Sequence, residues 1–105
     1  MHVVERELHG YKNRALPIRI DVETDDAPEA FANPRFRISN QVEIQTLPPY
    51  SGGSGVLFDV DISSSDLDFD AGKYRWELIA THNGETVTLA LGTFELEKEP
   101  TTAPA

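Results

Sequence analysis

The first candidates for metal ligands in this sequence are its histidines, His2, His9 and His82. Because the chain has no cysteine, thiol nucleophiles, disulfides and cysteine-based zinc sites are excluded. His2 and His9 lack the i, i+4 spacing of a helical metal pair, and the sequence places no third ligand beside them. His82 directly precedes a predicted turn, where a solvated side chain is expected. The sequence therefore predicts no metal centre and no cofactor.

A run of acidic residues imitates a calcium loop, because Asp66, Asp68, Asp70 and Glu77 stand at its positions 1, 3, 5 and 12. Such a loop requires glycine at position 6, whereas Gly72 falls at position 7. Flanking helices are not indicated either, and Glu77 lies in a predicted strand. The spacing is therefore not expected to bind calcium.

Catalytic patterns are missing as well. No serine lies in a G-x-S-x-G elbow. The glycine-rich residues 51–55 lack the lysine and the following helix of a phosphate loop. A pair of carboxylates would be uninformative, because among 18 acidic residues some pair will approach by chance. We expect no catalytic residue and no enzymatic activity.

The composition is typical of one acidic globular domain. A chain of 105 residues can form one modest core. Its net charge of −9 repels nucleic acid and anionic membrane surfaces, and its arginines are scattered singly. No apolar run approaches the roughly 20 residues of a membrane helix, and the N-terminus lacks the apolar region of a signal peptide. We expect neither nucleic acid nor membrane as a partner, and synthesis and assembly in the cytoplasm.

Apolar and polar residues alternate with a period of two, which predicts β-strands. The predicted strands are 16–22, 35–38, 42–44, 56–62, 73–82 and 85–97. Pro17 favours an edge position for the first of these strands. Asn83-Gly84 predicts a tight hairpin between the last two. In the final strand the inward residues change from odd positions, ending at Leu91, to even positions, beginning at Phe94, which predicts a β-bulge at Gly92.

Polar segments between the strands predict loops at 24–32, 48–55 and 63–70. Residues 48–55 are expected to form a long flexible loop, with Tyr50 as the aromatic residue best placed to meet a partner. Phe31 and Phe69 are expected to anchor their loops against the core. We expect residues 1–14 to form a strand or a docking arm, 15–98 the β-sandwich domain and 99–105 a flexible tail.

The segment 70–76 has the spacing of the D-x-G-x-Y-x-C tyrosine corner of immunoglobulin-like sandwiches. Asp70 and Gly72 would form the bend, and the Tyr74 hydroxyl would bond to backbone upstream. Trp76 stands where the cysteine would be and can fill the space between two sheets. We therefore predict an all-β, immunoglobulin-like antiparallel β-sandwich of roughly six to eight strands, without substantial helix.

The C-terminal half resembles the immunoglobulin-like domains of tailed-bacteriophage virion proteins, such as upper baseplate, long tail fibre and minor tail proteins. Their pattern is an A-G-x-Y-x-W/Y-E-L strand, a short hairpin and an L-x-x-G-x-F-x-L/V strand, matched here by 71–78, 83–85 and 89–96. The resemblance covers residues 55–98 and extends toward residue 15, whereas 1–14 depart from it. It implies structural roles for Asp70, Gly72, Tyr74, Trp76, Gly92 and Phe94, and it carries over no catalytic residue.

The resemblance further implies a non-enzymatic virion component, present in many copies and assembled in the host cytoplasm. Such a subunit of the tail, baseplate or fibre docks to other virion proteins through edge strands, loops or termini. A capsid decoration or head-completion protein is the alternative. An alternative of a different class is a carbohydrate-binding or adhesion module, with Tyr50 and the loop 48–55 touching a glycan.

Overall fold

The computed structural model describes residues 3–98, in which nine strands and one 3₁₀ turn, Pro28–Ala30, are found. The strands are β1 (Val4–Glu5), β2 (Leu8–Tyr11), β3 (Leu16–Glu23), β4 (Ala32–Ile38), β5 (Val42–Gln45), β6 (Tyr50–Gly52), β7 (Gly55–Ile62), β8 (Gly72–His82) and β9 (Glu85–Glu97). Within these residues no helix is long and apolar enough to span a membrane. His2 and the predicted tail 99–105 lie outside the described residues.

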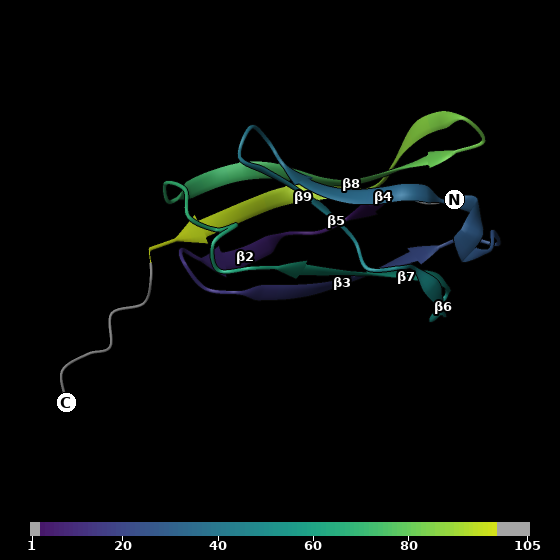
Figure 1. The fold of residues 1–105 in the computed structure, drawn as a ribbon, viewed down its shortest axis with the longest axis horizontal. Coiled ribbons are helices and arrows are strands. Elements are labelled where there is room, and N and C mark those ends of the chain that lie inside the picture. The colour runs from purple at the N-terminus through teal and green to yellow at the C-terminus, as the bar shows by residue number, and fades with distance from the viewer. Residues whose placement is uncertain (1–2, 99–105) are drawn as a thin grey trace.

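Two sheets pack face to face, as Figure 1 shows. The larger sheet has the order β1-β9-β8-β4-β5, with β2 also paired to β9, and the smaller has the order β3-β7-β6. In the immunoglobulin arrangement strands C, F and G share one sheet and strands B, E and D the other. Here β4, β8 and β9 take the places of C, F and G in the larger sheet, and β3, β7 and β6 take those of B, E and D. The predicted all-β sandwich is confirmed. The strand number exceeds the expected six to eight because two short N-terminal strands follow each other along β9 and residues 50–52 form a further strand, β6.

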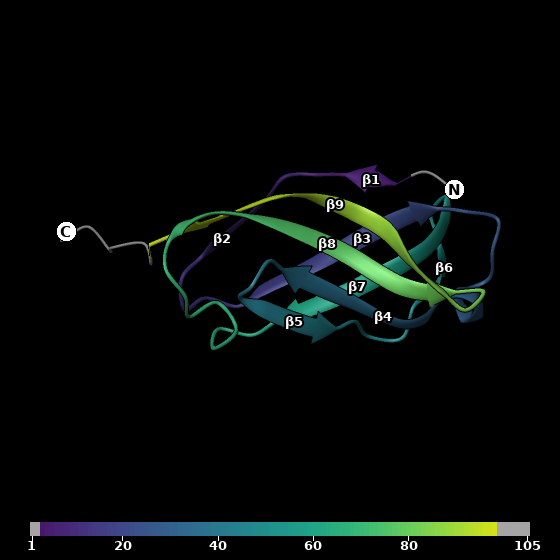
Figure 2. The same cartoon turned by 90° about the horizontal axis from the view of Figure 1, so that it is seen from above.

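These N-terminal strands run parallel to β9, along one edge of the larger sheet (Figure 2). Glu5 pairs with Leu91 and Leu8 with Phe94, so the register is continuous and the interruption at Arg6 lies opposite Gly92. The parallel direction departs from an all-antiparallel sandwich. Because this segment joins the larger sheet, β3 is left at the edge of the smaller one, which is the edge position that Pro17 predicts.

The hairpin predicted at Asn83-Gly84 is confirmed. These two residues have φ angles of 53° and 80°, as the tight turn requires, and His82 pairs with Glu85 across it. The side chain of His82 is less solvated than expected, because its ring stacks on Phe31 with centroids 5.2 Å apart. Its Nε2 also lies 3.1 Å from the Asp26 carboxylate.

The predicted bulge exists, but its predicted position was wrong. Leu78 pairs with Ala90 and Ile79 with Thr88, so Leu89 is the extra residue. Gly92 instead pairs regularly with Trp76. A Cβ at Gly92 would lie 1.8 Å from the Arg6 carbonyl oxygen and 2.9 Å from the Trp76 indole nitrogen. Glycine is therefore required there by close packing of backbone and indole, not by a bulge.

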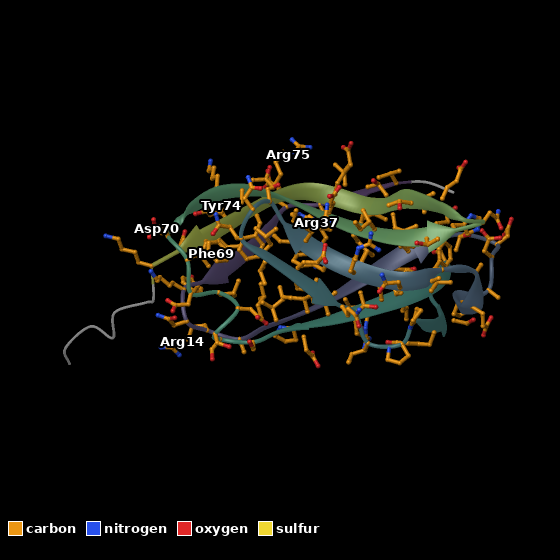
Figure 3. All side chains as sticks on the ribbon, turned by 45° about the horizontal axis from the view of Figure 1, so that its top comes forward. Arg14, Arg37, Phe69, Asp70, Tyr74 and Arg75 are labelled. Atoms are coloured by element: carbon orange, nitrogen blue, oxygen red, sulfur yellow. The ribbon has the colours of Figure 1, made fainter. Side chains whose placement is uncertain are left out.

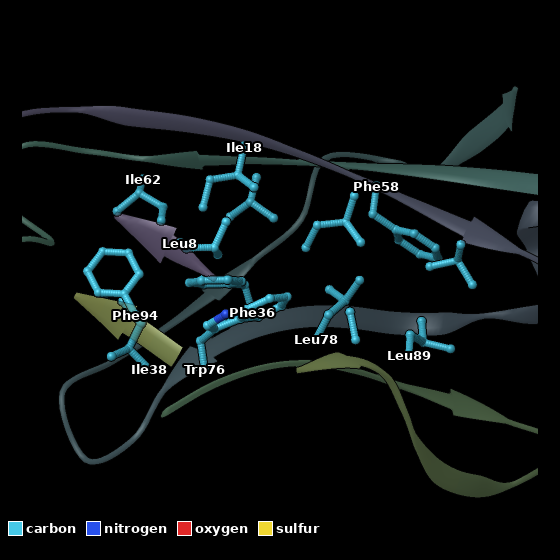
Figure 4. Close-up of a cluster of buried hydrophobic side chains, with 14 of the residues drawn as sticks. Leu8, Ile18, Phe36, Ile38, Phe58, Ile62, Trp76, Leu78, Leu89 and Phe94 are labelled. Atoms are coloured by element: carbon cyan, nitrogen blue, oxygen red, sulfur yellow. The ribbon is translucent and has the colours of Figure 1, made fainter. Parts of the chain in front are cut away.

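Trp76 lies at the centre of the core between the sheets, with 1% of its surface exposed. Figure 4 shows its ring against Phe36, with centroids 5.5 Å apart, and Ile18 and Ile62 facing it from the smaller sheet. The indole N–H donates to the Arg6 carbonyl oxygen at 2.9 Å. Among residues 3–98 no buried side-chain nitrogen or oxygen lacks a hydrogen-bond partner. Trp76, which stands where immunoglobulin domains have a cysteine, thus packs between the two sheets and binds the N-terminal segment.

The tyrosine corner closes one end of the sandwich (Figure 3). The Tyr74 hydroxyl donates to the Asp70 carbonyl oxygen at 2.5 Å, and its half-buried ring meets Phe69 edge-on at 5.0 Å. Gly72 begins β8 with a φ of 159°, at the border of the extended region. Glycine is therefore less strictly required at position 72 than at position 92. Phe94 is fully buried in the strand paired with β8.

Candidate docking surface

The outer face of the smaller sheet gathers an aromatic ring, an arginine, an exposed leucine and two carboxylates. We call this surface the Tyr50 face; it consists of Pro17, Arg19, Leu47, Tyr50, Asp59 and Asp61. Along β3 and β7 the odd-numbered residues point outward, because the even-numbered ones fill the core. Arg19 and Asp59 are paired across the two strands. The sheet therefore positions these two side chains next to each other on its outer surface.

Tyr50 reaches this surface because residues 48–55 are not the flexible loop that the sequence predicts. Tyr50–Gly52 form β6, which pairs with β7 through a two-residue turn at Gly53 and Ser54. Gly53 has a φ of 53°, so a glycine accommodates the left-handed turn without steric cost. The glycine-rich composition thus encodes a tight hairpin rather than a linker.

Asp59 connects the polar groups of the Tyr50 face. Its carboxylate accepts a hydrogen bond from Arg19 Nε at 2.8 Å and another from the Tyr50 hydroxyl at 3.0 Å. The Arg19 guanidinium carbon also lies 6.0 Å from the centre of the Tyr50 ring, within reach of a cation–π contact. Tyr50 retains 38% of its surface exposed. The tyrosine is therefore held in one orientation while its ring stays accessible.

These contacts shift the ionisation of the cluster. The hydrogen bond from Arg19, assisted by that from Tyr50, lowers the pKa of Asp59 below its ordinary value. Partial burial and the bond to Asp59 raise the pKa of the Tyr50 hydroxyl. At neutral pH Asp59 is therefore a carboxylate, Arg19 a guanidinium and Tyr50 a neutral phenol.

The lowered pKa of Asp59 predicts a pH-dependent contribution to stability. A carboxyl whose pKa is lower in the folded than in the unfolded chain stabilises the fold above its unfolded pKa, and this stabilisation is lost as the pH falls through the folded pKa. Asp59→Asn should therefore melt below the parent at pH 7, and this difference should begin to close below about pH 4. Thermal melts of both proteins between about pH 2 and pH 8 measure this difference. A constant difference across that range would contradict the assignment.

A shallow hollow of about 290 Å³ adjoins Asp59, lined by Pro17, Ile18, Arg19, Leu47, Asp59 and Asp61. The Leu47 N–H donates to the Asp59 carbonyl oxygen at 2.9 Å. This bond holds residues 46–49, which connect β5 to β6 without regular secondary structure, against β7. The Leu47 side chain is 46% exposed. The surface thus combines an apolar centre with charged neighbours.

The sequence predicts Tyr50 as a contact residue but not its neighbours. Arg19 and Asp59 belong to other predicted strands, and Leu47 precedes the predicted loop without belonging to an element. The alternation of β3 and β7 is the available signal that Arg19 and Asp59 point outward. The other predicted positions, from Asp70 to Phe94, lie in the core or at the tyrosine corner and not on this surface.

The acidic residues that imitate a calcium loop are not brought together. Asp66 caps its own loop by accepting hydrogen bonds from the Ser63 N–H and hydroxyl, and Glu77 pairs with Arg37 on the outer face of the larger sheet. Across residues 3–98, the potential metal ligands that converge are instead His9, Glu95 and Glu97. This group could not be predicted from the sequence, because it depends on the parallel pairing of β2 with β9.

Comparisons with known proteins do not assign the chain to a family. No family model and no curated protein matches it. Among solved structures it is similar to a 2,6-sialyltransferase of Photobacterium sp. JT-ISH-224, a member of the Vibrionaceae, in complex with CMP and lactose, with a TM-score of 0.38 and 11% identity. The match covers 91% of this chain but 18% of that chain. A likeness of this degree supports no statement about activity.

Proposed function

We propose that this chain is a non-enzymatic structural subunit of a tailed-bacteriophage virion, associated with the tail, baseplate or fibre, that docks to a neighbouring virion protein through the Tyr50 face. The residues that carry the resemblance to such domains support this reading, because they have architectural contacts. Tyr74 bonds to Asp70, Trp76 bonds to Arg6, and Gly92 allows that approach.

The observation that carries the docking proposal is the orientation of Tyr50 by Asp59 beside Arg19. Tyrosine and arginine are enriched among the residues that dominate binding energy at protein interfaces. Because Tyr50 is already held by a hydrogen bond, little side-chain entropy remains to be lost when a partner covers it. Leu47 adds apolar area beside it.

The charge around this centre specifies the chemistry of the partner. Exposed outward residues of β3 and β7 include Asp21, Glu23 and Asp61, against the single cation Arg19, which is already paired with Asp59. The whole chain is acidic as well, with a net charge of −9. We therefore propose a partner surface with an apolar centre surrounded by lysine or arginine side chains.

Co-purification with proteins encoded by neighbouring virion genes, followed by affinity measurement, tests this proposal. Tyr50→Ala should weaken the complex by about 30-fold, the effect of losing an interface residue worth about 2 kcal/mol. Tyr11→Ala is the matched control, because Tyr11 is also 38% exposed but lies in β2 of the other sheet. Its affinity should equal that of the parent.

Equal affinities of the Tyr50→Ala variant and the parent would contradict docking through this face. Binding to a glycan that Tyr50→Ala abolishes would instead support the adhesion-module alternative and overturn the proposal. Association with capsid rather than tail proteins would identify the head-decoration alternative. Circular dichroism of the variant confirms that it is folded before each comparison.

A further inference from the structure

Three potential metal ligands meet on the outer face of the larger sheet, at the end where β2 accompanies β9. His9 pairs with Glu95 in the parallel register, and Glu97 follows two positions later along the same strand. Directly paired residues point to the same side of a sheet, as do residues at i and i+2 of one strand. The side chains of His9, Glu95 and Glu97 therefore point into one region of space.

The distances between their donor atoms suit a single ion. His9 Nε2 lies 3.0 Å from Glu97 Oε1, and one ligand atom from each of the three residues lies within 4.8 Å of the others. Zinc bonds nitrogen and oxygen at about 2.0–2.2 Å, so two donors on one tetrahedral ion are roughly 3.3–3.6 Å apart. The separations of up to 4.8 Å exceed that spacing by little more than 1 Å, a distance that rotation of exposed side chains is expected to close.

The donor set also distinguishes between classes of metal. One imidazole and two carboxylates suit first-row divalent ions such as zinc, whereas calcium usually takes about six to eight oxygen ligands. The Tyr11 ring lies edge-on to the His9 ring, with centroids 5.1 Å apart, and restricts its orientation. By contrast, His82 meets a single carboxylate, that of Asp26.

We propose that His9, Glu95 and Glu97 bind a zinc-class divalent ion that fastens the N-terminal strand β2 to the C-terminal strand β9. The adjoining hollow of about 290 Å³ is lined by Glu7, Leu8, His9, Lys73, Thr93 and Glu95. It gives solvent access to the ion and leaves room for a water ligand in the fourth position. Lys73 is the cation on the rim of this hollow, and it opposes binding electrostatically while Glu7 favours it.

Titration of the untagged full chain with ZnCl₂ tests the proposal, by calorimetry and by thermal melting. A single ion should bind, and at a free zinc concentration about ten times Kd the Tm should rise by about 5–10 °C. Calcium and magnesium at the same concentration should leave the Tm unchanged. No heat of binding and no Tm shift at millimolar zinc would overturn the proposal.

Variants locate the site. His9→Gln and Glu97→Gln should each weaken zinc binding by at least about tenfold. Replacing even a residue that only hydrogen-bonds a metal ligand typically lowers metal affinity by about that factor. Both side chains are nearly half exposed, so the metal-free variants should melt as the parent does. His82→Gln is the matched control and should bind zinc normally. Zinc binding that survives His9→Gln, or that is lost in His82→Gln, would contradict the assigned site.

Discussion

Trp76→Ala should lower the free energy of unfolding by about 3–5 kcal/mol, the range for truncation of a large buried aromatic residue. Trp76 is the single tryptophan of the chain and is almost completely buried, so the truncation leaves a cavity between the sheets. It also removes the stacking partner of Phe36 and the donor to the Arg6 carbonyl. Small domains have a total stability of about 5–15 kcal/mol, so this variant should be only marginally folded.

Thermal melting followed by circular dichroism measures this effect, because the variant has no tryptophan fluorescence. The Tm should fall by about 15 °C or more, since each kcal/mol corresponds to about 4–8 °C in a domain of this size. Trp76→Phe should lower the free energy of unfolding by less, because an aromatic ring still packs on Phe36. The remaining loss comes from the Arg6 carbonyl, which has no donor in this variant. Leu47→Ala is the control for an exposed apolar residue and should stay within about 0.5 kcal/mol. A Trp76→Ala variant that melts within a few degrees of the parent would remove Trp76 from the core.

Gly92→Ala should have the second-largest effect, about 3 kcal/mol, because the added methyl group would overlap backbone. Its Cβ would lie 1.8 Å from the Arg6 oxygen and 2.8 Å from the Arg6 carbonyl carbon. Neither atom is the end of a flexible side chain, so the N-terminal segment must move away from β9. The Trp76 indole N–H would lose its acceptor as a consequence.

Hydrogen exchange can separate this local effect from general destabilisation. The Arg6 N–H donates to Leu91 and the Lys12 N–H donates to Glu97, so both amides report on the pairing with β9. Their protection should fall in Gly92→Ala more than that of the β8–β9 hairpin. Gly84→Ala is the control, because no atom lies within 4 Å of its Cβ position and its cost of about 1–2 kcal/mol comes from φ alone. Unchanged protection at Arg6 and Lys12 would contradict the steric explanation.

Local patterns in the sequence predicted the parts of the fold that depend on neighbouring residues. Alternation located the strands, Asn83-Gly84 located the hairpin, and Pro17 indicated an edge. Residues 48–55 were predicted wrongly, because a run of glycine and serine suits a flexible linker and a tight turn equally well. Only the pairing of Tyr50 with Leu57 distinguishes between them.

Features that depend on distant pairing were beyond the reach of these patterns. The attachment of Arg6 to β9 is a contact between the two ends of the chain, so no local periodicity encodes it. For the same reason the role of Gly92 was misassigned to a bulge, and the convergence of His9 with Glu95 was missed. Tyr50 could be selected as an exposed aromatic residue, but its partners Arg19 and Asp59 required the register of β3 with β7.

The residues of the tyrosine-corner motif build the fold and hold the N-terminal segment against it, so the outer faces of the sheets are the surfaces left for partners. The indole N–H of Trp76 reports on this directly, because the chain has one tryptophan and its resonance is unambiguous. Its exchange with D₂O should be as slow as that of the most protected backbone amides of β8, since the group is buried and donates to Arg6. Exchange as fast as that of a solvent-exposed indole would contradict the account.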